Sequence, residues 1–440
     1  MPLRLDAAAA GFEEAFAALI MGKRELEEDV DQAVAAIIAQ VRADGDAALI
    51  ALTTKYDRFA LTAETIRISQ AEIDAAADAA DTTAVAALEL AAERIAEFHR
   101  RQLPGAQDYV DTEGVRLGAR WTPVEAAGIY VPGGTAAYPS SVLMNAVPAK
   151  VAGVDRLVMT VPTPDGVLNP LVMAAARIAG VDEIYRVGGA QAVAALAYGT
   201  PSIAPVAKVV GPGNAFVAAA KRRVFGIVGI DMIAGPSEIL VVADGASDAA
   251  WIAADLLSQA EHDASSQSIL ITDDAPFADA VAAAVEAHLQ TLPRAEIARA
   301  SWEAHGAIIT VSTLGDVAAL VDRIAPEHLE LVVDDPDALM AKVRNAGSIF
   351  LGRHTPEAIG DYIAGPNHVL PTARSARFAS GLGVLDFMKR STFVGCSPEG
   401  LAAIGPAAVT LAEAEGFEAH ALSVALRLGD GNPNGGPAGR

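Results

Sequence analysis

The sequence is poor in cysteine and in aromatic residues, and both shortages narrow the kind of protein it can encode. Cys396 is its one cysteine among 440 residues, so no disulfide can form within the chain and cysteine-based metal ligation is excluded as a main motif. A reducing compartment is the simplest explanation. Aromatic residues make up only 5 % of the chain, whereas 52 % of it is apolar. This composition favours large cores in which small side chains pack helices closely against sheets.

Positive charge is also scarce. The formal net charge is −23, and an acidic surface repels nucleic acid and anionic lipid, which both need clustered Lys and Arg. The one basic patch, residues 221–223, is short. The sequence has no uncharged apolar run of about 18 residues, and residues 1–18 lack the order of a signal peptide. We therefore predict a cytoplasmic protein that binds neither nucleic acid nor membranes.

Apolar periodicity predicts a helical N-terminal part followed by alternating strands and helices. Apolar residues between Val30 and Val41 recur at helical spacing before Gly45, and a second helix is expected over 82–102. Strands are then expected at 157–161, 183–187, 208–210, 238–242, 268–272 and 307–311, and helices at 168–179, from 191 on, at 214–223 and at 247–262. After residue 380 the chain is expected to be mostly helical again. The alternation predicts a parallel sheet covered on both faces.

Three glycine turns follow predicted strands, at 133–134, 188–189 and 211–213. Such turns let the backbone approach a ligand at the carboxyl ends of parallel strands. Each alone is equally an ordinary tight turn, and none forms a full G-x-G-x-x-G fingerprint. Three of them within 90 residues favour a nucleotide-type site.

Polar residues at two places suit metal binding or proton transfer. Gln259 and His262 share one face of the predicted 247–262 helix, so they could hold a divalent metal, although capping or a surface position is the simpler interpretation of this pair. Pro326 suits the first turn of a helix, in which Glu327 and His328 would stand side by side as an acid and an imidazole. A helix-start Glu and a half-buried His would produce the same pattern.

The remaining candidates are weaker when each is taken alone. Asp361 lies in a predicted loop, where it could be a metal ligand or a turn residue. His368 is expected to bond the backbone in its proline-bracketed loop, and His354 is ambiguous. Glu415 and His420 flank a helix junction near Gly416, where helix capping is the simpler role. The other histidines are predicted at the surface: His99, His288 and His305.

A series of motifs resembles the histidinol dehydrogenase family. In order, they are GIYVPGG at 128–134, YPSSVLMN at 138–145, GPGN at 211–214, IAGPSE at 233–238, SQAEHD at 258–263, PEHLE at 326–330, GPNHVLPT at 365–372 and EGFEAH at 415–420. Any one could arise by chance, but the ordered set is specific and spans roughly residues 20 to 425. The chain departs from the family pattern at Phe216, where tyrosine is more usual, and in its Gly/Asn/Pro tail.

The resemblance implies a zinc-dependent, four-electron oxidation of L-histidinol through L-histidinaldehyde to L-histidine, with two NAD⁺ used at one site. Glu327 and His328 would be the catalytic acid–base pair, and Tyr130, Gln191 and Asn214 would contact the cofactor. The zinc ligands would be Gln259, His262, Asp361 and His420. Substrate would be bound by Ser237, Gln259, His262, His328, Asp361, Glu415 and His420. The family also implies a homodimer in which Glu415 and His420 come from the partner subunit.

We accordingly predict an α/β fold with two Rossmann-like parallel-sheet domains, which lack a standard fingerprint, plus small helical N- and C-terminal segments. The expected parts are an N-terminal arm (1–26), a discontinuous first domain (27–129 with 237–380), a cofactor-side second domain (130–236), a C-terminal helical segment (381–428) and a disordered tail (429–440). Two other functions are left open. One is a zinc hydrolase with Glu327 as base, against which the absence of a His-Glu-x-x-His motif argues; the other is a non-catalytic binding protein.

Overall fold

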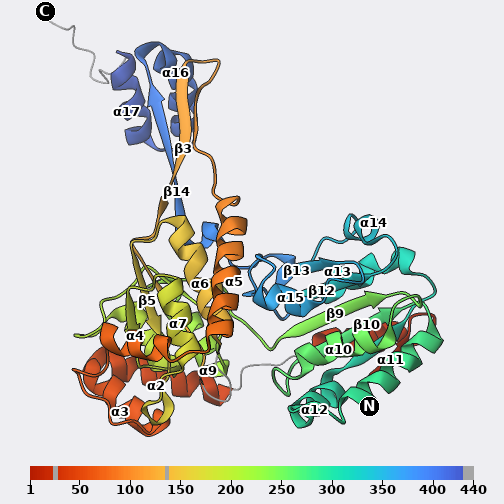
Figure 1. The fold of residues 1–440 in the computed structure, drawn as a ribbon. Helices are drawn as coiled ribbons and strands as arrows, with labels where there is room; N and C mark the ends of the chain where they lie inside the picture. Colours follow the sequence, from red (N-terminus) through yellow and green to blue (C-terminus); the bar gives the residue numbers. More distant parts are fainter. Residues whose placement is uncertain (23–27, 134–137, 430–440) are drawn as a thin grey trace, which may run out of the picture. The chain divides into compact units, whose positions relative to one another are not determined.

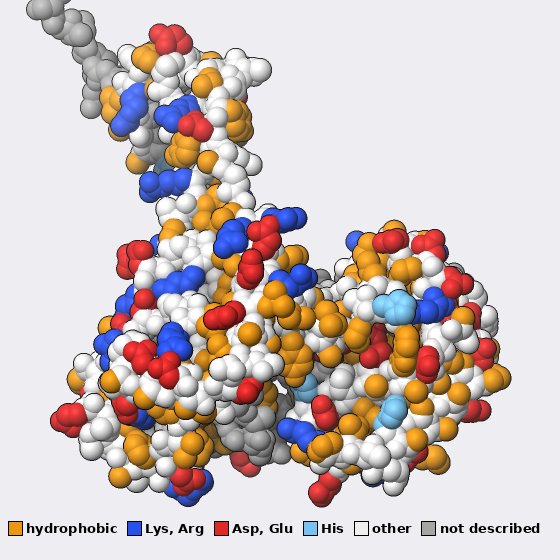
Figure 2. All heavy atoms as spheres, viewed as in Figure 1, with side chains coloured by type: hydrophobic (Ala, Val, Ile, Leu, Met, Phe, Trp, Pro, Cys, Tyr) orange, Lys and Arg blue, Asp and Glu red, His pale blue; other side chains and the backbone are white. Residues whose placement is uncertain are grey.

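The computed structural model describes residues 1–22, 28–133 and 138–429, and chain contacts divide it into two compact units (Figure 1). The first unit comprises Met1–Gln102 and Val124–Phe387. The second comprises Leu103–Pro123 and the chain from Met388 on. The predicted tail, 429–440, lies outside the described residues beyond Gly429. On the face drawn in Figure 2, acidic and basic side chains are interspersed.

The first unit contains a six-stranded parallel sheet. Its order is β1 (Leu3–Asp6), β11 (Ala307–Thr310), β10 (Gln267–Thr272), β9 (Glu238–Ala243), β12 (His328–Val332) and β13 (Ser348–Leu351). The expected N-terminal arm supplies the edge strand β1. Strands β9 and β12 are buried along their whole length, as near-continuous apolar runs in parallel sheets are.

Alternate residues of β9 enter different cores, because successive side chains of a strand point to opposite faces. Ile239 and Val241 pack in one core with α10 (Ala249–Ala260), α11 (Ala275–His288) and α12 (Ala295–His305). Leu240 and Val242 pack in the other, with α1 (Phe12–Met21) and α13 (Ala318–Ile324). Helices therefore cover both faces, and α10 and α13 lie on opposite sides of the sheet.

The first unit also holds a five-stranded parallel sheet. Its order is β6 (Glu183–Tyr185), β5 (Arg156–Thr160), β4 (Ala126–Tyr130), β7 (Lys208–Val210) and β8 (Gly229–Ile230). The helices that follow its strands are α6 (Pro139–Ala152), α7 (Pro170–Ile178), α8 (Gly189–Tyr198) and α9 (Ala215–Val224). Two parallel sheets with helices between their strands confirm the predicted fold class.

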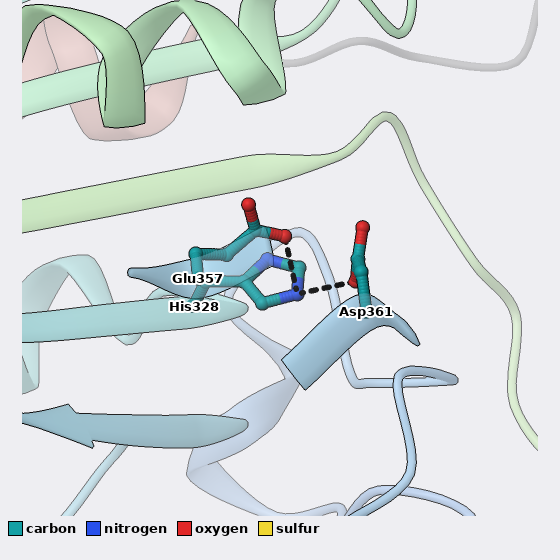
Figure 3. Close-up of side chains that lie close together, drawn as sticks. All are labelled: His328, Glu357 and Asp361. Atoms are coloured by element: carbon teal, nitrogen blue, oxygen red, sulfur yellow. Dashed lines mark ion pairs between the residues drawn. The ribbon is translucent and has the colours of Figure 1, made fainter. Parts of the chain in front are cut away.

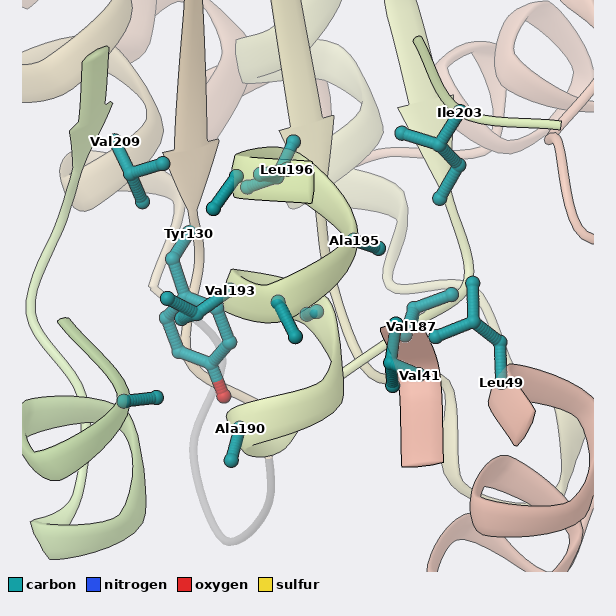
Figure 4. Packing of buried hydrophobic residues seen from close by; sticks show 14 of the residues in the cluster. Val41, Leu49, Tyr130, Val187, Ala190, Val193, Ala195, Leu196, Ile203 and Val209 are labelled. Carbon is teal, nitrogen blue, oxygen red and sulfur yellow. The ribbon is translucent and has the colours of Figure 1, made fainter. Parts of the chain in front are cut away.

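The early helices share a core with this second sheet. They are α2 (Glu28–Asp44), α3 (Asp46–Asp57), α4 (Gln70–Asp78) and α5 (Thr82–Arg100). Val41 and Leu49 belong to one buried cluster with Val193 and Leu196 of α8, and all four are essentially inaccessible to solvent; Val41 and Leu49 lie beside Val187 in Figure 4. The predicted boundaries grouped residues 27–129 with 237–380, whereas these contacts link α2 and α3 to the five-stranded sheet. The exact domain limits stay a prediction.

The second unit pairs three antiparallel strands with two helices. The strands run in the order β14 (Met388–Cys396), β3 (Val115–Pro123) and β2 (Gln107–Val110), and the helices are α16 (Pro398–Ala414) and α17 (Glu418–Leu428). The prediction of mostly helical structure after residue 380 missed β14. Most of the β14 side chains are exposed, so the strand lacks a buried apolar face, and pairing with β3 defines it.

One further expectation is corrected by burial. His99, predicted at the surface, is fully buried, and its Nδ1 lies 2.7 Å from the carbonyl oxygen of Ile95. No helix within 1–22, 28–133 and 138–429 is long and apolar enough to cross a membrane.

The packing of α3 generates a stability prediction. Replacing the buried Leu49 with Ala should lower the free energy of unfolding by about 2–5 kcal/mol, because a cavity remains in the shared core. Leu90→Ala on α5 is the matched control, since that side chain is about half exposed and its loss should cost under ~0.5 kcal/mol. Thermal unfolding of both variants measures the difference; equal midpoints would mean that α3 is not packed as described.

Candidate active site

Glu327 and His328 lie at the amino end of strand β12 in the six-stranded sheet. His328 is the first residue of β12 and pairs with Ile239 of β9, which places both residues beside Glu238. The prediction that Pro326 begins a helix is wrong. Helix α13 ends just before it, Ala325 takes the left-handed conformation (φ 49°), and the alternating residues from His328 on continue as a buried strand.

The hydrogen bonds of His328 identify its basic nitrogen. Nδ1 lies 3.0 Å from the carbonyl oxygen of Glu238, which can only accept, so Nδ1 carries the proton and donates. Nε2 is then the lone-pair nitrogen, and it has no hydrogen-bond partner among the described residues. Burial lowers the pKa of His328, with Asp361 acting in the opposite direction. The imidazole is therefore neutral near pH 7 and able to accept a proton through Nε2.

Glu327 is a buried carboxyl held by the same neighbour. Its Oε2 accepts the backbone N–H of Glu238 at 2.8 Å and lies 3.7 Å from Nδ1 of His328. Burial raises the pKa of Glu327 well above its usual range, while the Glu238 N–H opposes this. Burial thus raises the pKa of the carboxyl and lowers that of the imidazole, and such perturbed pKa values are common at catalytic sites.

Asp361 lies where several of the predicted residues converge. It belongs to the short helix α15 (Glu357–Tyr362) and not to the predicted loop. Its Oδ1 is 3.8 Å from Nε2 of His328, and its Oδ2 is 4.0 Å from Nε2 of His262. His368 bonds the Asp361 carbonyl at 2.9 Å, as expected of a backbone-bonding histidine.

Two of the residues predicted to bind zinc, His262 and Asp361, lie together, and a third, Gln259, has a buried oxygen. Gln259, near the end of α10, is 1 % exposed, and its Oε1 has no partner within the described part of the chain. His262 follows two residues after α10 ends, so the chain turns its ring toward Asp361. An amide oxygen, an imidazole and a carboxylate form a mixed nitrogen and oxygen set that zinc accepts. Their ligand role remains a prediction.

A neighbouring group offers a second arrangement of ligand atoms. His328, Glu357 and Asp361 each present one such atom, all within 4.8 Å of one another (Figure 3). Glu357 Oε1 lies 3.6 Å from Nε2 of His328, and Ser258 donates to its Oε2 at 3.1 Å. Burial raises the pKa of Glu357 well above its usual range, with Asp361 as the next cause.

Sequence reasoning missed Glu357 and Glu330. Glu357 stands one helical turn before Asp361, and Glu330 follows His328 on the same face of β12; both spacings are visible in the sequence. Their burial is not visible, because it depends on α10 and α15 packing over the strand. Glu330 and Glu357 are each 1 % exposed, and Glu330 Oε1 accepts the Glu357 N–H at 2.6 Å.

The other predicted substrate residues are placed as follows. Ser237 directly precedes β9, next to the Glu238 backbone that bonds Glu327 and His328. Glu415 ends α16, and His420 lies in the first turn of α17 with its ring 5.3 Å from that of Phe417. Both belong to the second unit and are exposed, so their part in the site remains a prediction.

The predicted cofactor residues follow the carboxyl ends of strands in the five-stranded sheet. Tyr130 ends β4, Gln191 lies in the first turn of α8 after β6, and Asn214 caps α9 after β7. Strands β4 and β7 are neighbours although the chain first runs from β4 toward β5. Such a reversal of strand order is where open α/β sheets bind ligands.

A buried ion pair fixes the turn between β7 and Asn214. Lys221 and Asp231 pair with almost no exposure; Lys221 donates to the Gly211 carbonyl at 2.9 Å, and Asp231 accepts the Gly211 N–H at 2.8 Å. Gly211 has φ 115°, and a Cβ there would lie 2.2 Å from the carbonyl oxygen of Tyr130. Only glycine fits this close approach.

The fold and the site define a class: an α/β protein with two Rossmann-like sheets and a buried acid–imidazole pair beside a metal-compatible cluster. The family model of histidinol dehydrogenase matches residues 21–428. The chain belongs to the histidinol dehydrogenase family and is therefore a dehydrogenase.

The chain is similar to named histidinol dehydrogenases along nearly its whole length. It is 69 % identical to the histidinol dehydrogenase of Rhodospirillum rubrum, over 98 % of this chain and 100 % of that one. It is 64 % identical to that of Bradyrhizobium diazoefficiens, over 97 % and 99 %. The crystal structure of histidinol dehydrogenase from Elizabethkingia anophelis matches with a TM-score of 0.93 at 37 % identity, covering 97 % of this chain and 98 % of that one. These findings favour a dehydrogenase over the hydrolase and the non-catalytic binding protein.

The Gly211 turn generates a second stability prediction. Lys221→Met should lower the free energy of unfolding by about 3–5 kcal/mol, because it leaves Asp231 buried without its cation. Arg223→Met, two residues along α9, breaks the partly exposed pair with Asp31 and should cost at most about 1 kcal/mol. Denaturant unfolding compares the two. If Lys221→Met lost no more stability than the control, the buried Lys221–Asp231 pair would not stabilise the Gly211 turn as described.

Proposed function

We propose that this protein oxidises L-histidinol through L-histidinaldehyde to L-histidine in histidine biosynthesis, using two NAD⁺ at one site that holds one zinc ion. Family membership supports the substrate. The observation that carries the mechanism is the adjacency of two differently tuned proton-transfer groups, Glu327 and His328, to the cluster around Asp361. Both oxidations need a base, and one of them also needs an activated water.

His328 acts in the first oxidation. An alcohol is a poor hydride donor until it gains alkoxide character, so its proton must leave as hydride departs from carbon. Nε2 of His328 takes that proton, and the Nδ1–H bond to Glu238 keeps the ring in the required tautomer. A correctly placed base contributes roughly 10²–10⁴-fold. The carboxylate of Asp361, 3.8 Å from Nε2, stabilises the imidazolium that forms.

Glu327 acts in the second oxidation. The aldehyde carbon carries no hydroxyl group whose proton a base could remove until water adds to it. The Glu327 carboxylate takes a proton from that water as it attacks, and the hydrate then gives up its hydride with His328 again as base. Burial, which raises the pKa of Glu327, makes it a stronger base than an ordinary carboxylate.

Zinc and cofactor supply the rest of the chemistry when they are bound. Zinc, held by Gln259, His262, Asp361 and a partner's His420, would bind the imidazole and amino nitrogens of the substrate and so orient it. NAD⁺, contacted by Tyr130, Gln191 and Asn214, would accept the hydride. The buried Oε1 of Gln259, which has no hydrogen-bond partner among the described residues, supports the first site. The reversal of strand order at β4 and β7 supports the second.

The central test is turnover of the purified chain with L-histidinol and NAD⁺, with and without a chelator. Two NADH should appear per histidinol consumed, and removal of the metal should abolish the reaction. One NADH per substrate, or full activity in chelator-treated protein whose zinc is gone, would contradict the proposal.

Variants of the two proton-transfer residues should differ in which oxidation step they slow. His328→Asn should lower kcat for both histidinol and histidinaldehyde by roughly 10²–10⁴-fold while zinc stays bound, because the same base serves both steps. Glu327→Gln should mainly slow histidinaldehyde oxidation. Single-turnover assays started from each substrate measure the steps separately. Equal losses in both steps for Glu327→Gln would remove its proposed role.

The metal assignment can be tested without reference to activity. His262→Asn should release zinc, as should Gln259→Leu, because each removes a ligand atom. His354→Asn is a matched control, since His354 is exposed and its ring lies 5.7 Å from that of Trp251. Elemental analysis of the dialysed proteins reads out the metal content; full zinc occupancy in His262→Asn would rule out ligation there.

The proposed sharing of residues between subunits predicts complementation. If Glu415 and His420 serve the partner's site, a dimer of one His420→Asn chain and one His328→Asn chain contains one complete site. Co-expressed, differently tagged chains should recover up to half of the wild-type activity per dimer, whereas each variant alone stays inactive. A mixed dimer as inactive as its parents would place both residues in the site of their own chain.

A further inference from the structure

Two of the sequence motifs, 233–238 and 365–372, are joined by a hydrogen bond that the proposed reaction does not use. Gly235 donates its backbone N–H to Oγ1 of Thr372 at 2.5 Å, although 137 positions separate the two residues. The segments pack directly on each other, because a Cβ added to Gly235 would lie 3.2 Å from that oxygen. Thr372 is 3 % exposed, so the bond is largely shielded from water, where leaving a donor unpaired is costly.

A second hydrogen bond ties the same two segments together. The backbone N–H of Ala373, the residue after Thr372, donates to Oε1 of Glu238 at 3.2 Å. The segment 235–238 is therefore held at both ends by consecutive residues of one loop. Ser237, which is assigned to the substrate site, lies between the two bonds.

The bond at Gly235 is the one that strand pairing does not duplicate. Strand β9 begins at Glu238, which pairs with Gln267 of β10, and the Gln267 N–H also donates to the Ser237 carbonyl at 3.0 Å. Gly235 precedes this ladder and lies outside every described strand. The Thr372 hydroxyl therefore fixes the direction in which the chain approaches Ser237.

The loop has an unfavourable backbone directly after Thr372. Ala373 and Arg374 are consecutive non-glycine residues with positive φ, 51° and 63°. Such conformations persist where surrounding contacts impose them, and they cluster at functional sites. The Thr372 carbonyl also accepts the N–H of Ser375 at 3.0 Å, which closes the turn. This turn presents the threonine hydroxyl and the following N–H to the same segment.

Ser237 is held by its backbone while its side chain stays available. The residue is half-buried, and its hydroxyl makes no hydrogen bond to another described residue. A polar group whose backbone is already ordered binds a ligand better, because little freedom remains to be lost on binding. The contacts of Gly235 with the Thr372 loop supply that order.

We propose that Thr372 is a positioning residue of the substrate site, whose hydroxyl fixes the Gly235 backbone and so directs the Ser237 hydroxyl toward the substrate. The inference rests on the proposed function, because that function assigns Ser237 to the substrate. The proton-transfer pair is oriented by the Glu238 backbone inside the sheet. Loss of the Thr372 hydroxyl should therefore weaken substrate binding and leave the proton transfers intact.

Steady-state kinetics with L-histidinol and NAD⁺ test this role. Thr372→Val keeps the shape but removes the acceptor, so it should raise KM for L-histidinol about tenfold, the size of one lost hydrogen bond, with little change in kcat. Thr372→Ser keeps the hydroxyl and should restore a KM close to that of the wild type. An equal rise in KM for both variants, or a loss confined to kcat, would overturn the proposal.

A matched control uses the same substitution at another buried threonine. Thr53 on α3 is inaccessible to solvent, and its hydroxyl has no partner within the described residues. Thr53→Val should therefore leave KM for L-histidinol unchanged. A rise equal to that of Thr372→Val would show that KM responds to any buried threonine and would refute the specific role.

A double-mutant cycle shows whether Thr372 acts through Ser237. Ser237→Ala should raise KM for L-histidinol by itself. Adding Thr372→Val to it should have little further effect, because the hydroxyl that is positioned has gone. Additive effects of the two substitutions would contradict a positioning role through Ser237.

Hydrogen exchange tests the bond without an activity measurement. The Gly235 amide should exchange faster in Thr372→Val than in the wild type or in Thr372→Ser, because its acceptor is removed. Unchanged exchange with normal wild-type turnover would overturn this inference alone. Wild-type protein without turnover of L-histidinol would instead contradict the proposed function and the positioning role together.

Discussion

The backbone of one residue, Glu238, orients both proton-transfer groups of the site. Its N–H donates to Glu327 and its carbonyl accepts from His328, so a single peptide position at the start of β9 fixes a carboxylate and a tautomer together. This works because β9 and β12 are parallel neighbours in fixed register. A one-residue slip of that register would turn His328 to the other face of the sheet and separate it from Asp361.

The surroundings of this pair are unusually rich in buried acid. Glu330 and Glu357 sit behind His328 with raised pKa values, and burial is the main cause for each. An apolar core would be more stable there, so the carboxyls must be retained for another reason. A metal beside Asp361, as proposed above, would supply positive charge next to this group.

Much of the fold could be predicted from the sequence, because its parallel strands are short apolar runs between Ala-rich helices. Strand β14 could not, since its side chains are mostly exposed and β3, far away in the sequence, defines it. At the site, residue types were visible but their setting was not. Pro326 resembles a helix start until Ala325 is known to end α13, and Glu357 is an ordinary helical acid until packing buries it. Local pattern identifies candidates, whereas burial and partners come from tertiary contacts.

The pairing of β3 with β14 also sets an order of events during synthesis. Val115 pairs with Cys396, so β3 must wait for about 280 further residues before its partner leaves the ribosome. At a translation rate of roughly 5–20 residues per second, that delay is on the order of 15–55 seconds. Throughout it, the nascent β2–β3 hairpin has an unpaired edge, a template for pairing with other chains. The order of these strands along the chain therefore leaves one edge of the small sheet exposed to other chains while the protein is being made.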